Sequence, residues 1–203
     1  MSKPDRSIDP RILNSAKKVF LTHGFQNASL KEICEDAGIT TGALYKRYKG
    51  KEALFRAVVE DTVAALDDFV EQRSAANVSA LSDDSLVKAW DMDEKNTLEY
   101  FQFFYEHHDG FILLLKCAEG TAYSNFQHDW VEKMTVKTYE YFLEARKRGL
   151  THTDISMDEL HILLSAFWTT IYEPFIHGFT WAQMEVHCKV ICGLFNWYRV
   201  LGF

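Results

Sequence analysis

Apolar side chains recur every three to four positions along most of the chain, which is the spacing of an α-helix with one buried face. The first such stretch begins after Asp9-Pro10, an N-cap followed by a first-turn proline, and ends at His23-Gly24. Alternating β-branched runs are almost absent, and the chain has only 3 prolines and 10 glycines. The pattern therefore predicts an all-α fold.

The stretch from Ser29 to Phe55 has the punctuation of two short helices joined by a tight turn. Ser29 and Glu32 have the spacing of a capping box, in which each side chain bonds a free backbone N–H of the first turn. Gly38 ends this helix where a left-handed residue is needed, and Thr40 or Thr41 can cap the next helix. Such a pair predicts a helix-turn-helix motif over about residues 29–48.

The second helix of this motif would present a small, hydroxyl-bearing and basic face. Leu44 and Tyr48 are four positions apart and are expected to face inward. The side chains then directed toward solvent, phosphate or base edges are Thr41, Ala43, Tyr45, Lys46 and Arg47. A face of this kind suits a DNA groove. The alternative is a helical hairpin with a solvated basic face.

The chain resembles the tetracycline-repressor (TetR) family of transcriptional regulators over roughly Arg11 to Glu60. Glycines, aromatic residues and the segment Lys51 to Phe55 all fall in the register of that family. The resemblance implies that Tyr45 and Lys51 contact phosphate, with Lys51 at the N-terminus of the following helix, where the helix dipole also favours an anion.

Three departures from the family pattern bear on DNA contacts rather than on the fold: Thr41, Tyr48 and the pair Lys49-Gly50. Thr41 bears on which operator sequence is preferred. Tyr48 and Lys49-Gly50 add a hydroxyl and a charge near the DNA backbone. The candidate DNA-binding residues are Ser29, Thr40, Thr41, Gly42, Ala43, Tyr45, Lys46, Arg47, Tyr48 and Lys51.

Charge is distributed unevenly along the chain. The net charge of −7 by itself argues against a nucleic-acid binder. However, residues 1–56 hold 11 Lys/Arg against 6 Asp/Glu, a net +5, and the remainder hold 11 against 23, a net −12. This distribution concentrates attraction to DNA in the N-terminal part. We expect a helix-turn-helix DNA-binding domain over residues 6–66 and a helical effector-binding and dimerisation domain over 67–203, with about nine helices in all.

The last two predicted helices, Met157 to Gly178 and Trp181 to Phe203, are apolar on two sides. Such helices must be covered on both sides, and a chain of this size cannot easily bury so much apolar surface alone. By resemblance, they would pair with their copies in a four-helix homodimer bundle that matches a palindromic operator. The alternative is a deep monomer core. Candidate interface residues are Leu160, Leu164, Phe167, Ile171, Val190, Leu194, Trp197 and Leu201.

Aromatic residues concentrate in the C-terminal part, where 22 of the 29 lie from residue 100 onward. Aromatic walls suit an apolar or aromatic small molecule held by a few polar groups, although any single aromatic residue is more often core. The resemblance implies an effector cavity in this domain without identifying its lining. Candidate ligand-binding residues are Phe101, Phe104, Tyr105, His108, Leu114, Trp130, Met134, Phe167, Trp168 and Tyr172.

Signals for catalysis or metal binding are weak. His107-His108-Asp109 are adjacent on one predicted helix, so their side chains diverge. Cys188 and Cys192, one turn apart, could form a soft-metal or redox site, but core packing is the simpler interpretation. No GxSxG, glycine-rich phosphate loop or HExxH motif occurs. We expect neither an enzyme nor a bound metal or cofactor.

The most apolar window, Ile162 to Tyr172, is 11 residues long, short of the ~20 that a bilayer-spanning helix needs. The four cysteines show no CxxC spacing. These features predict a cytoplasmic protein with reduced thiols and no membrane partner.

Together these features predict a homodimeric regulator, a repressor released from a double-stranded operator by a small apolar or aromatic effector. The effector would favour a conformation whose recognition helices no longer match half-sites ~34–36 Å apart. The alternative is a helical protein- or ligand-binding module that does not act on DNA, and an enzyme ranks third. Steep salt dependence of DNA binding would separate the first two hypotheses.

Overall fold

The computed structural model describes residues 8–74 and 77–203, and the regular elements in these ranges are helical, as the sequence predicts. The chain forms two compact units. The first, which we call the head, comprises Met1–Asp67 and His107–Phe126. The second, the body, comprises Asp68–Glu106 and Gln127–Phe203.

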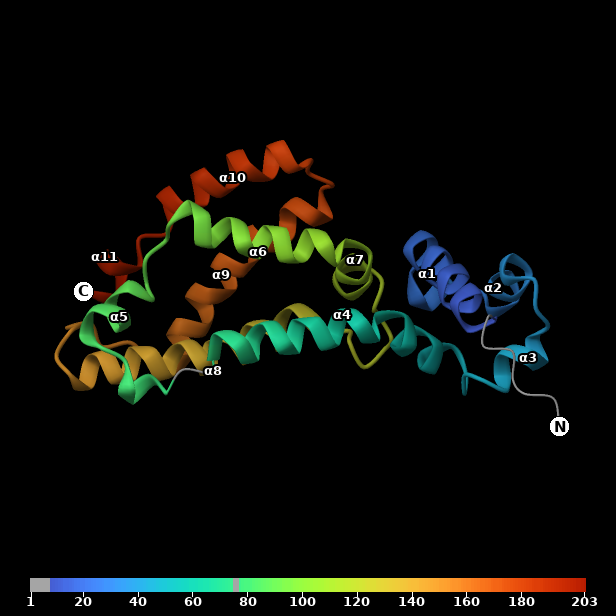
Figure 1. The fold of residues 1–203 in the computed structure, drawn as a ribbon, viewed down its shortest axis with the longest axis horizontal. Helices are drawn as coiled ribbons and strands as arrows, with labels where there is room; N and C mark the ends of the chain where they lie inside the picture. The colour runs from blue at the N-terminus through green and yellow to red at the C-terminus, as the bar shows by residue number, and fades with distance from the viewer. Residues whose placement is uncertain (1–7, 75–76) are drawn as a thin grey trace. The chain divides into compact units, whose positions relative to one another are not determined.

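The head contains α1 (Ile8–Asn27), α2 (Leu30–Ala37), α3 (Thr41–Tyr45), the first part of α4 (Lys51–Ser74) and α7 (His108–Lys116) (Figure 1). Gly24 interrupts the regular helix of α1 with a φ of 71°, which agrees with the helix end predicted at His23-Gly24. Side chains from four helices fill the core of the head and are completely buried: Ile12, Phe20, Ile33, Leu44 and Phe55.

Helix α7 belongs to the head although it is about forty residues further along the chain than the end of the head's part of α4. The Phe25 amide donates to the Cys117 carbonyl over 2.9 Å. Gly110 faces Thr62 of α4 so closely that a Cβ on the glycine would lie 2.7 Å from Cβ of the threonine. The lack of a side chain at Gly110 is therefore what allows α7 to approach α4.

The body contains the 3-10 turn η1 (Val78–Ala80), α5 (Asp83–Lys88), α6 (Glu94–Glu106), α8 (Phe126–Lys147), α9 (Met157–Ile176), α10 (Trp181–Leu194) and α11 (Trp197–Leu201), and α10 runs beside α6 (Figure 1). Thr180 and Gln183 form a complete capping box at the start of α10. Helices α5 and α11 have only six and five residues. Helices this short cannot be recognised from the spacing of their apolar residues.

The last predicted helix, Trp181 to Phe203, is in fact two helices. Phe195 has φ −93° and ψ 100°, which is extended backbone, and α10 therefore ends at Leu194. Asn196 then caps α11, because its side chain accepts a hydrogen bond from the Arg199 amide at 2.9 Å. The prediction of a continuous helix was wrong because an asparagine cap within an apolar stretch redirects the chain.

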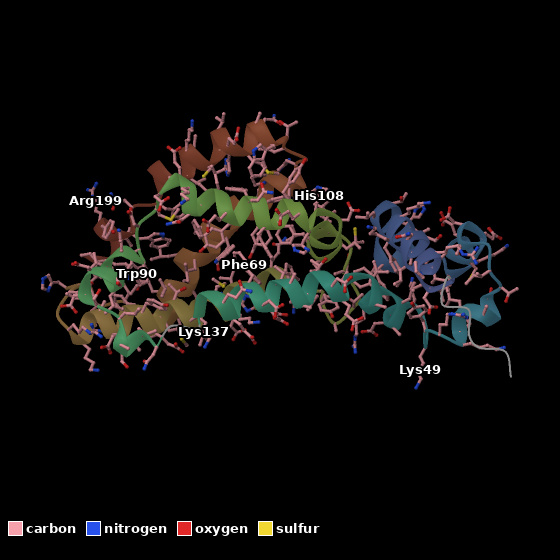
Figure 2. All side chains as sticks on the ribbon, in the orientation of Figure 1. Lys49, Phe69, Trp90, His108, Lys137 and Arg199 are labelled. Atoms are coloured by element: carbon pink, nitrogen blue, oxygen red, sulfur yellow. The ribbon has the colours of Figure 1, made fainter. Side chains whose placement is uncertain are left out.

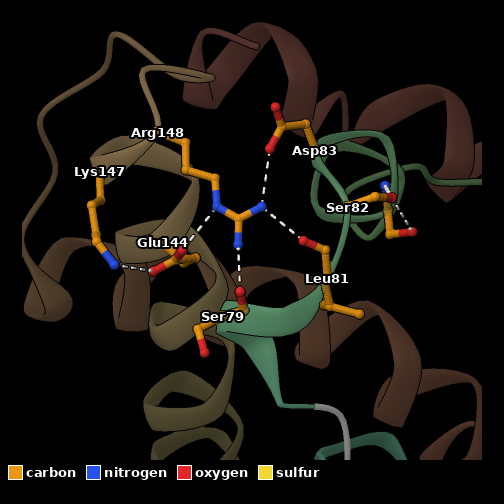
Figure 3. Close-up of polar contacts among 8 residues, drawn as sticks. Ser79, Leu81, Ser82, Asp83, Glu144, Lys147 and Arg148 are labelled. Atoms are coloured by element: carbon orange, nitrogen blue, oxygen red, sulfur yellow. Dashed lines mark hydrogen bonds and ion pairs between the residues drawn. The ribbon is translucent and has the colours of Figure 1, made fainter.

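Arg148 joins the end of α8 to the segment that leads into α5 (Figure 3). Its Nε donates to Glu144 at 2.8 Å, and its Nη2 donates to the Ser79 carbonyl at 2.9 Å. Nη1 donates to the Leu81 carbonyl at 2.7 Å and to Asp83 at 3.0 Å. The planar guanidinium thus fixes η1 and the first residue of α5 at one point.

Candidate nucleic-acid interface and ligand cavity

Helices α2 and α3 are held by the caps that the sequence predicts. The Ser29 hydroxyl accepts from the Glu32 amide at 3.5 Å, and the Thr40 hydroxyl accepts from the Ala43 amide at 3.2 Å, so Thr40 rather than Thr41 caps α3. Gly38 between them has a left-handed φ of 65°. The Glu32 carboxylate lies 3.3 Å from His23 Nε2, so the predicted reciprocal box at Ser29 is one-sided.

The outer face of α3 carries the side chains expected of a DNA-reading helix. Leu44 is completely buried, and Tyr48 is half-buried, as predicted for the inner side. Burial raises the pKa of the Tyr48 hydroxyl, which the Asp9 carboxylate raises further, so this group stays protonated. Lys49 projects from the turn after α3 (Figure 2). The exposed residues of the motif's second helix are Thr41, Gly42, Tyr45 and Lys46, while Ala43 is half-buried.

Arg47 does not share this outer face, contrary to the outward direction predicted for it. Its Nε lies 2.5 Å from Asp9 Oδ1, and its Nη1 donates to the Ala43 carbonyl at 3.3 Å. The guanidinium therefore ties α3 to the start of α1. These two contacts orient α3 within the head.

Lys51 also has an intramolecular role. Its Nζ donates to the carbonyls of Gln26 and Ala28 at 2.8 and 3.1 Å and lies 4.8 Å from the centre of the Phe25 ring. An ammonium has three donors, so one N–H remains for a phosphate oxygen. Substituting Lys51 would therefore disturb the head as well as any phosphate contact.

Gly42 lies inside α3. Among the residues that the structure describes, a Cβ there would meet only Thr40 Oγ1, at an ordinary 4.0 Å. A glycine within a helix is less stable than alanine by about 1 kcal/mol. Neither the backbone conformation nor the packing of the described residues requires glycine at this position, so the surface of α3 at Gly42 is open.

The body contains two adjoining cavities of about 280 and 240 Å³. They share five lining residues: Ala89, Trp90, Tyr100, Met134 and Thr138. The larger cavity is also lined by buried apolar side chains, Leu164, Phe167, Trp168 and Trp197. Exposed polar residues surround its mouth: Lys88, Asp91, Asn96 and Glu99.

Only part of the predicted ligand-binding set lines these cavities, namely Met134, Phe167 and Trp168. Tyr105 is 47 % exposed and packs on Trp181, and His108 and Leu114 belong to the head. The remaining four are buried in an aromatic cluster, in which Phe104 contacts Trp130 and Trp168: Phe101, Phe104, Trp130 and Tyr172. Trp90 and Tyr100 were not predicted: Trp90 follows a helix of only six residues, and Tyr100 lies one position before the stripe of Phe101, Phe104 and Tyr105 that was chosen.

The predicted interface residues divide into buried and exposed groups. Six are buried in the described chain and cannot form a free surface: Leu160, Leu164, Phe167, Ile171, Trp197 and Leu201. They were predicted at the interface because an inner stripe of a helix has the same apolar spacing as an outer one. Val190 and Leu194 remain, 61 % and 68 % exposed, beside the exposed Val186 on α10 and Ile162 on α9.

The thiols behave as core groups. Cys188 donates to the Glu94 carbonyl at 3.5 Å and Cys192 to Thr97 Oγ1 at 3.3 Å. Burial, with a contribution from Cys192, raises the pKa of Cys188 to about 12, so its thiol is protonated at neutral pH and is a poor metal ligand or nucleophile. Among residues 8–74 and 77–203, no three metal-ligating side chains gather into a possible metal site.

No helix within the described ranges has the length and apolar character needed to cross a bilayer.

The helix-turn-helix segment is similar in sequence to known regulatory proteins. Residues 12–58 match the family model described as bacterial regulatory proteins, tetR family. The HTH-type transcriptional regulator UidR of Escherichia coli (strain K12) is 44 % identical over 62 residues, which are 30 % of this chain and 32 % of UidR. The chain thus aligns with about a third of that relative's length.

Weaker similarity extends over most of the chain. The HTH-type transcriptional repressor AcnR of Corynebacterium diphtheriae is 24 % identical over 170 residues, covering 81 % of this chain and 77 % of AcnR. The crystal structure of the transcriptional regulator FadR from Bacillus subtilis in complex with stearoyl-CoA superposes with a TM-score of 0.56 at 13 % identity, covering 91 % and 96 % of the two chains. This structure shares the fold.

Proposed function

We propose that the chain, whose residues 12–58 match the model of the tetR family of bacterial regulatory proteins, is a member of that family and a homodimeric transcriptional repressor. In this proposal, α2 and α3 of each head bind one half of a palindromic operator in double-stranded DNA. A small molecule held in the cavity of the body releases the protein from the operator. The protein acts in the cytoplasm and catalyses no reaction.

The single observation that carries this proposal is the outer face of α3. Its exposed residues combine a hydroxyl, an absent side chain, an aromatic ring and a cation: Thr41, Gly42, Tyr45 and Lys46. Lys46 has the length and charge to reach guanine O6 and N7 in a major groove, and the Thr41 methyl group can contact a thymine methyl. The +5 net charge of residues 1–56 attracts the phosphates on both sides of that groove.

Dimerisation would use the outer face of α9 and α10. Ile162, Val186, Val190 and Leu194 are all exposed and apolar, which is the composition of a contact surface rather than of a solvated helix face. A second copy related by a two-fold axis would cover this face and place two recognition helices on a palindrome.

Release by a ligand requires a difference in affinity between two conformations. A molecule that binds the cavity better in one arrangement of the body shifts the population toward that arrangement. If that arrangement misplaces the recognition helices, the ligand lowers operator affinity, and by linkage the operator lowers ligand affinity by the same factor.

The experiment begins by selecting bound fragments from genomic DNA and measuring their affinity by fluorescence anisotropy at several salt concentrations. Replacing Lys46 by Ala should weaken binding to the selected sequence by about tenfold or more and change which base is preferred. Lys95→Ala, which removes an exposed lysine from α6 in the body, is the matched control and should leave operator affinity unchanged. Affinity that is insensitive to salt, or equal losses in the two variants, would favour a binding module that does not act on DNA.

A further inference from the structure

Two lysines follow α3 closely in sequence, Lys49 in the turn after it and Lys51 at the start of α4, and they differ in their surroundings. Lys51 is half-buried, and its Nζ donates to the carbonyls of Gln26 and Ala28 at 2.8 and 3.1 Å. Lys49 is exposed, and among residues 8–74 and 77–203 neither its ammonium nor its backbone amide has a hydrogen-bond or ion-pair partner. The cation that is available to another molecule is therefore chiefly that of Lys49.

The turn that carries Lys49 is short and well defined. The Tyr48 amide still donates to the Leu44 carbonyl at 2.9 Å, as in an α-helix, so Lys49 is the first residue beyond the helical pattern of α3. Gly50 has a left-handed φ of 103°, which favours glycine, and its carbonyl already accepts from the Leu54 amide of α4 at 3.2 Å. The chain thus passes from one helical hydrogen-bond pattern to the next within two residues, and Lys49 projects from this turn (Figure 2).

A residue directly after the helix that reads DNA lies near the border of the groove. When α3 occupies a major groove, which is about 12 Å wide, the phosphates of the two strands border the helix on either side. The chain that leaves α3 therefore passes close to one of these strands. Lys49 offers that strand an ammonium and a backbone N–H, two of the donors with which proteins contact phosphate oxygens.

The charged residues near this turn leave the Lys49 ammonium available. Arg47, two positions earlier, is bound to Asp9. Glu52 is exposed on the first turn of α4, but no ion pair joins it to Lys49. Lys46 is exposed just after α3 and adds positive charge near the same turn. A phosphate at Lys49 would therefore gain a cation without separating an ion pair of the head.

We propose that Lys49 is the main cation that contacts the phosphate backbone of the operator at the start of α4, whereas Lys51 chiefly joins α4 to the chain at the end of α1. This assignment rests on the proposed function. It differs from the one that the family resemblance implies, in which Lys51 makes the phosphate contact. One phosphate beside each half-site should therefore be neutralised by Lys49.

Lys49→Gln tests the proposal by fluorescence anisotropy at several salt concentrations. One phosphate contact contributes about 0.9 to the slope of log affinity against log salt concentration, so the variant should lower this slope by about 0.9. It should also weaken binding to the selected operator and to a random duplex by the same factor. Lys49→Arg should keep the slope. Lys18→Gln is the matched control, because it removes another exposed lysine of the head, 3.4 Å from Asp36, and should leave the slope unchanged.

Lys51→Gln separates the two roles. The free energy of unfolding should fall, because the bonds to the Gln26 and Ala28 carbonyls are lost, whereas the salt slope should change less than in Lys49→Gln. Chemical denaturation measures the first effect, and anisotropy under conditions in which the variant is folded measures the second. A larger change of slope in Lys51→Gln than in Lys49→Gln would overturn the assignment.

Neutral methylphosphonate linkages, placed one at a time along the operator, locate the contact at a single phosphate. At one position beside the half-site, the unmutated protein should lose affinity and Lys49→Gln should lose none, as expected when both changes remove the same interaction. The absence of such a position, an unchanged slope in Lys49→Gln, or an equal loss of slope in Lys18→Gln would overturn the role of Lys49. Binding of the unmutated protein that is insensitive to salt would instead overturn the proposed function.

Discussion

The head and the body differ in how clearly their exposed side chains indicate a function. On α3 of the head, Thr41, Gly42 and Lys46 are exposed, and among the described residues a Cβ on Gly42 would have no neighbour closer than 4.0 Å. In the body, by contrast, apolar side chains serve as core, as cavity wall and as exposed face. The role of an exposed polar side chain can therefore be assigned from the direction in which it points. The role of an apolar side chain can be assigned only when the residues that cover it are known.

The largest expected effect tests whether the exposed apolar face of the body is an interface. Leu194→Glu would place an unpaired charge in a buried dimer contact, so the dimer should dissociate about a hundredfold more readily. Because Leu194 is exposed in the protomer, the monomer should still fold. Analytical ultracentrifugation and operator binding at matched concentrations measure the change.

The control for that variant is Leu143→Glu, the same substitution at an exposed leucine of α8. It should leave the dimer intact. Dissociation in both variants, or in neither, would move the interface away from α9 and α10.

The next effect concerns the packing of α7 in the head. Gly110→Ala would bring a Cβ to 2.7 Å from Cβ and 1.9 Å from Oγ1 of Thr62, so rotating the threonine side chain cannot remove the overlap. We expect the free energy of unfolding to fall by about 1–3 kcal/mol, measured by chemical denaturation. Gly110→Ala combined with Thr62→Ser should still be destabilised, because Cβ of the serine remains in the way.

Gly42→Ala should separate stability from recognition. Alanine in α3 should raise the free energy of unfolding by up to about 1 kcal/mol, while the added methyl group should lower operator affinity by about tenfold if DNA approaches the helix there. Denaturation and anisotropy on the same preparation measure the two effects. Unchanged operator affinity in a stabilised variant would place the groove contact elsewhere on α3.

The smallest effect is a pH dependence within the head. The Ser15 hydroxyl donates to Asp36 at 2.5 Å and, with Lys18, holds the pKa of that carboxyl below 3.8. A lowered folded-state pKa stabilises the fold above the unfolded value, and this contribution disappears as the pH falls through the folded-state pKa. The difference in melting temperature between the unmutated protein and Ser15→Ala should therefore narrow as the pH is lowered below about 3.8. A difference that is constant with pH would contradict this assignment.

The helix-turn-helix could be predicted closely because its determinants are local. Ser29, Gly38 and Thr40 act within a few residues of their own positions, and each has the role that its spacing indicates. The outward direction predicted for Arg47 was wrong because its partner Asp9 lies 38 positions away. Long-range pairing of this kind leaves no periodic trace in the sequence.

The cavity could be predicted as a feature of the body but not residue by residue. Phe104 and Phe167 follow similar helical spacing, yet the first is core and the second lines the larger cavity. Packing between helices, rather than position on one helix, makes this difference. Trp90 gave even less warning, since it follows the short α5 in a mostly polar segment.

The docking of α7 has a consequence for building chimeric regulators. A fragment cut after α4 would carry the whole helix-turn-helix but would lose Cys117, whose carbonyl receives the Phe25 amide, and Asp109, which pairs with Lys17 at 3.2 Å. The cut would also bare the side of α4 that Gly110 covers. A transplant of this DNA specificity onto another sensor must therefore bring residues 107–126 with it, as a discontinuous graft.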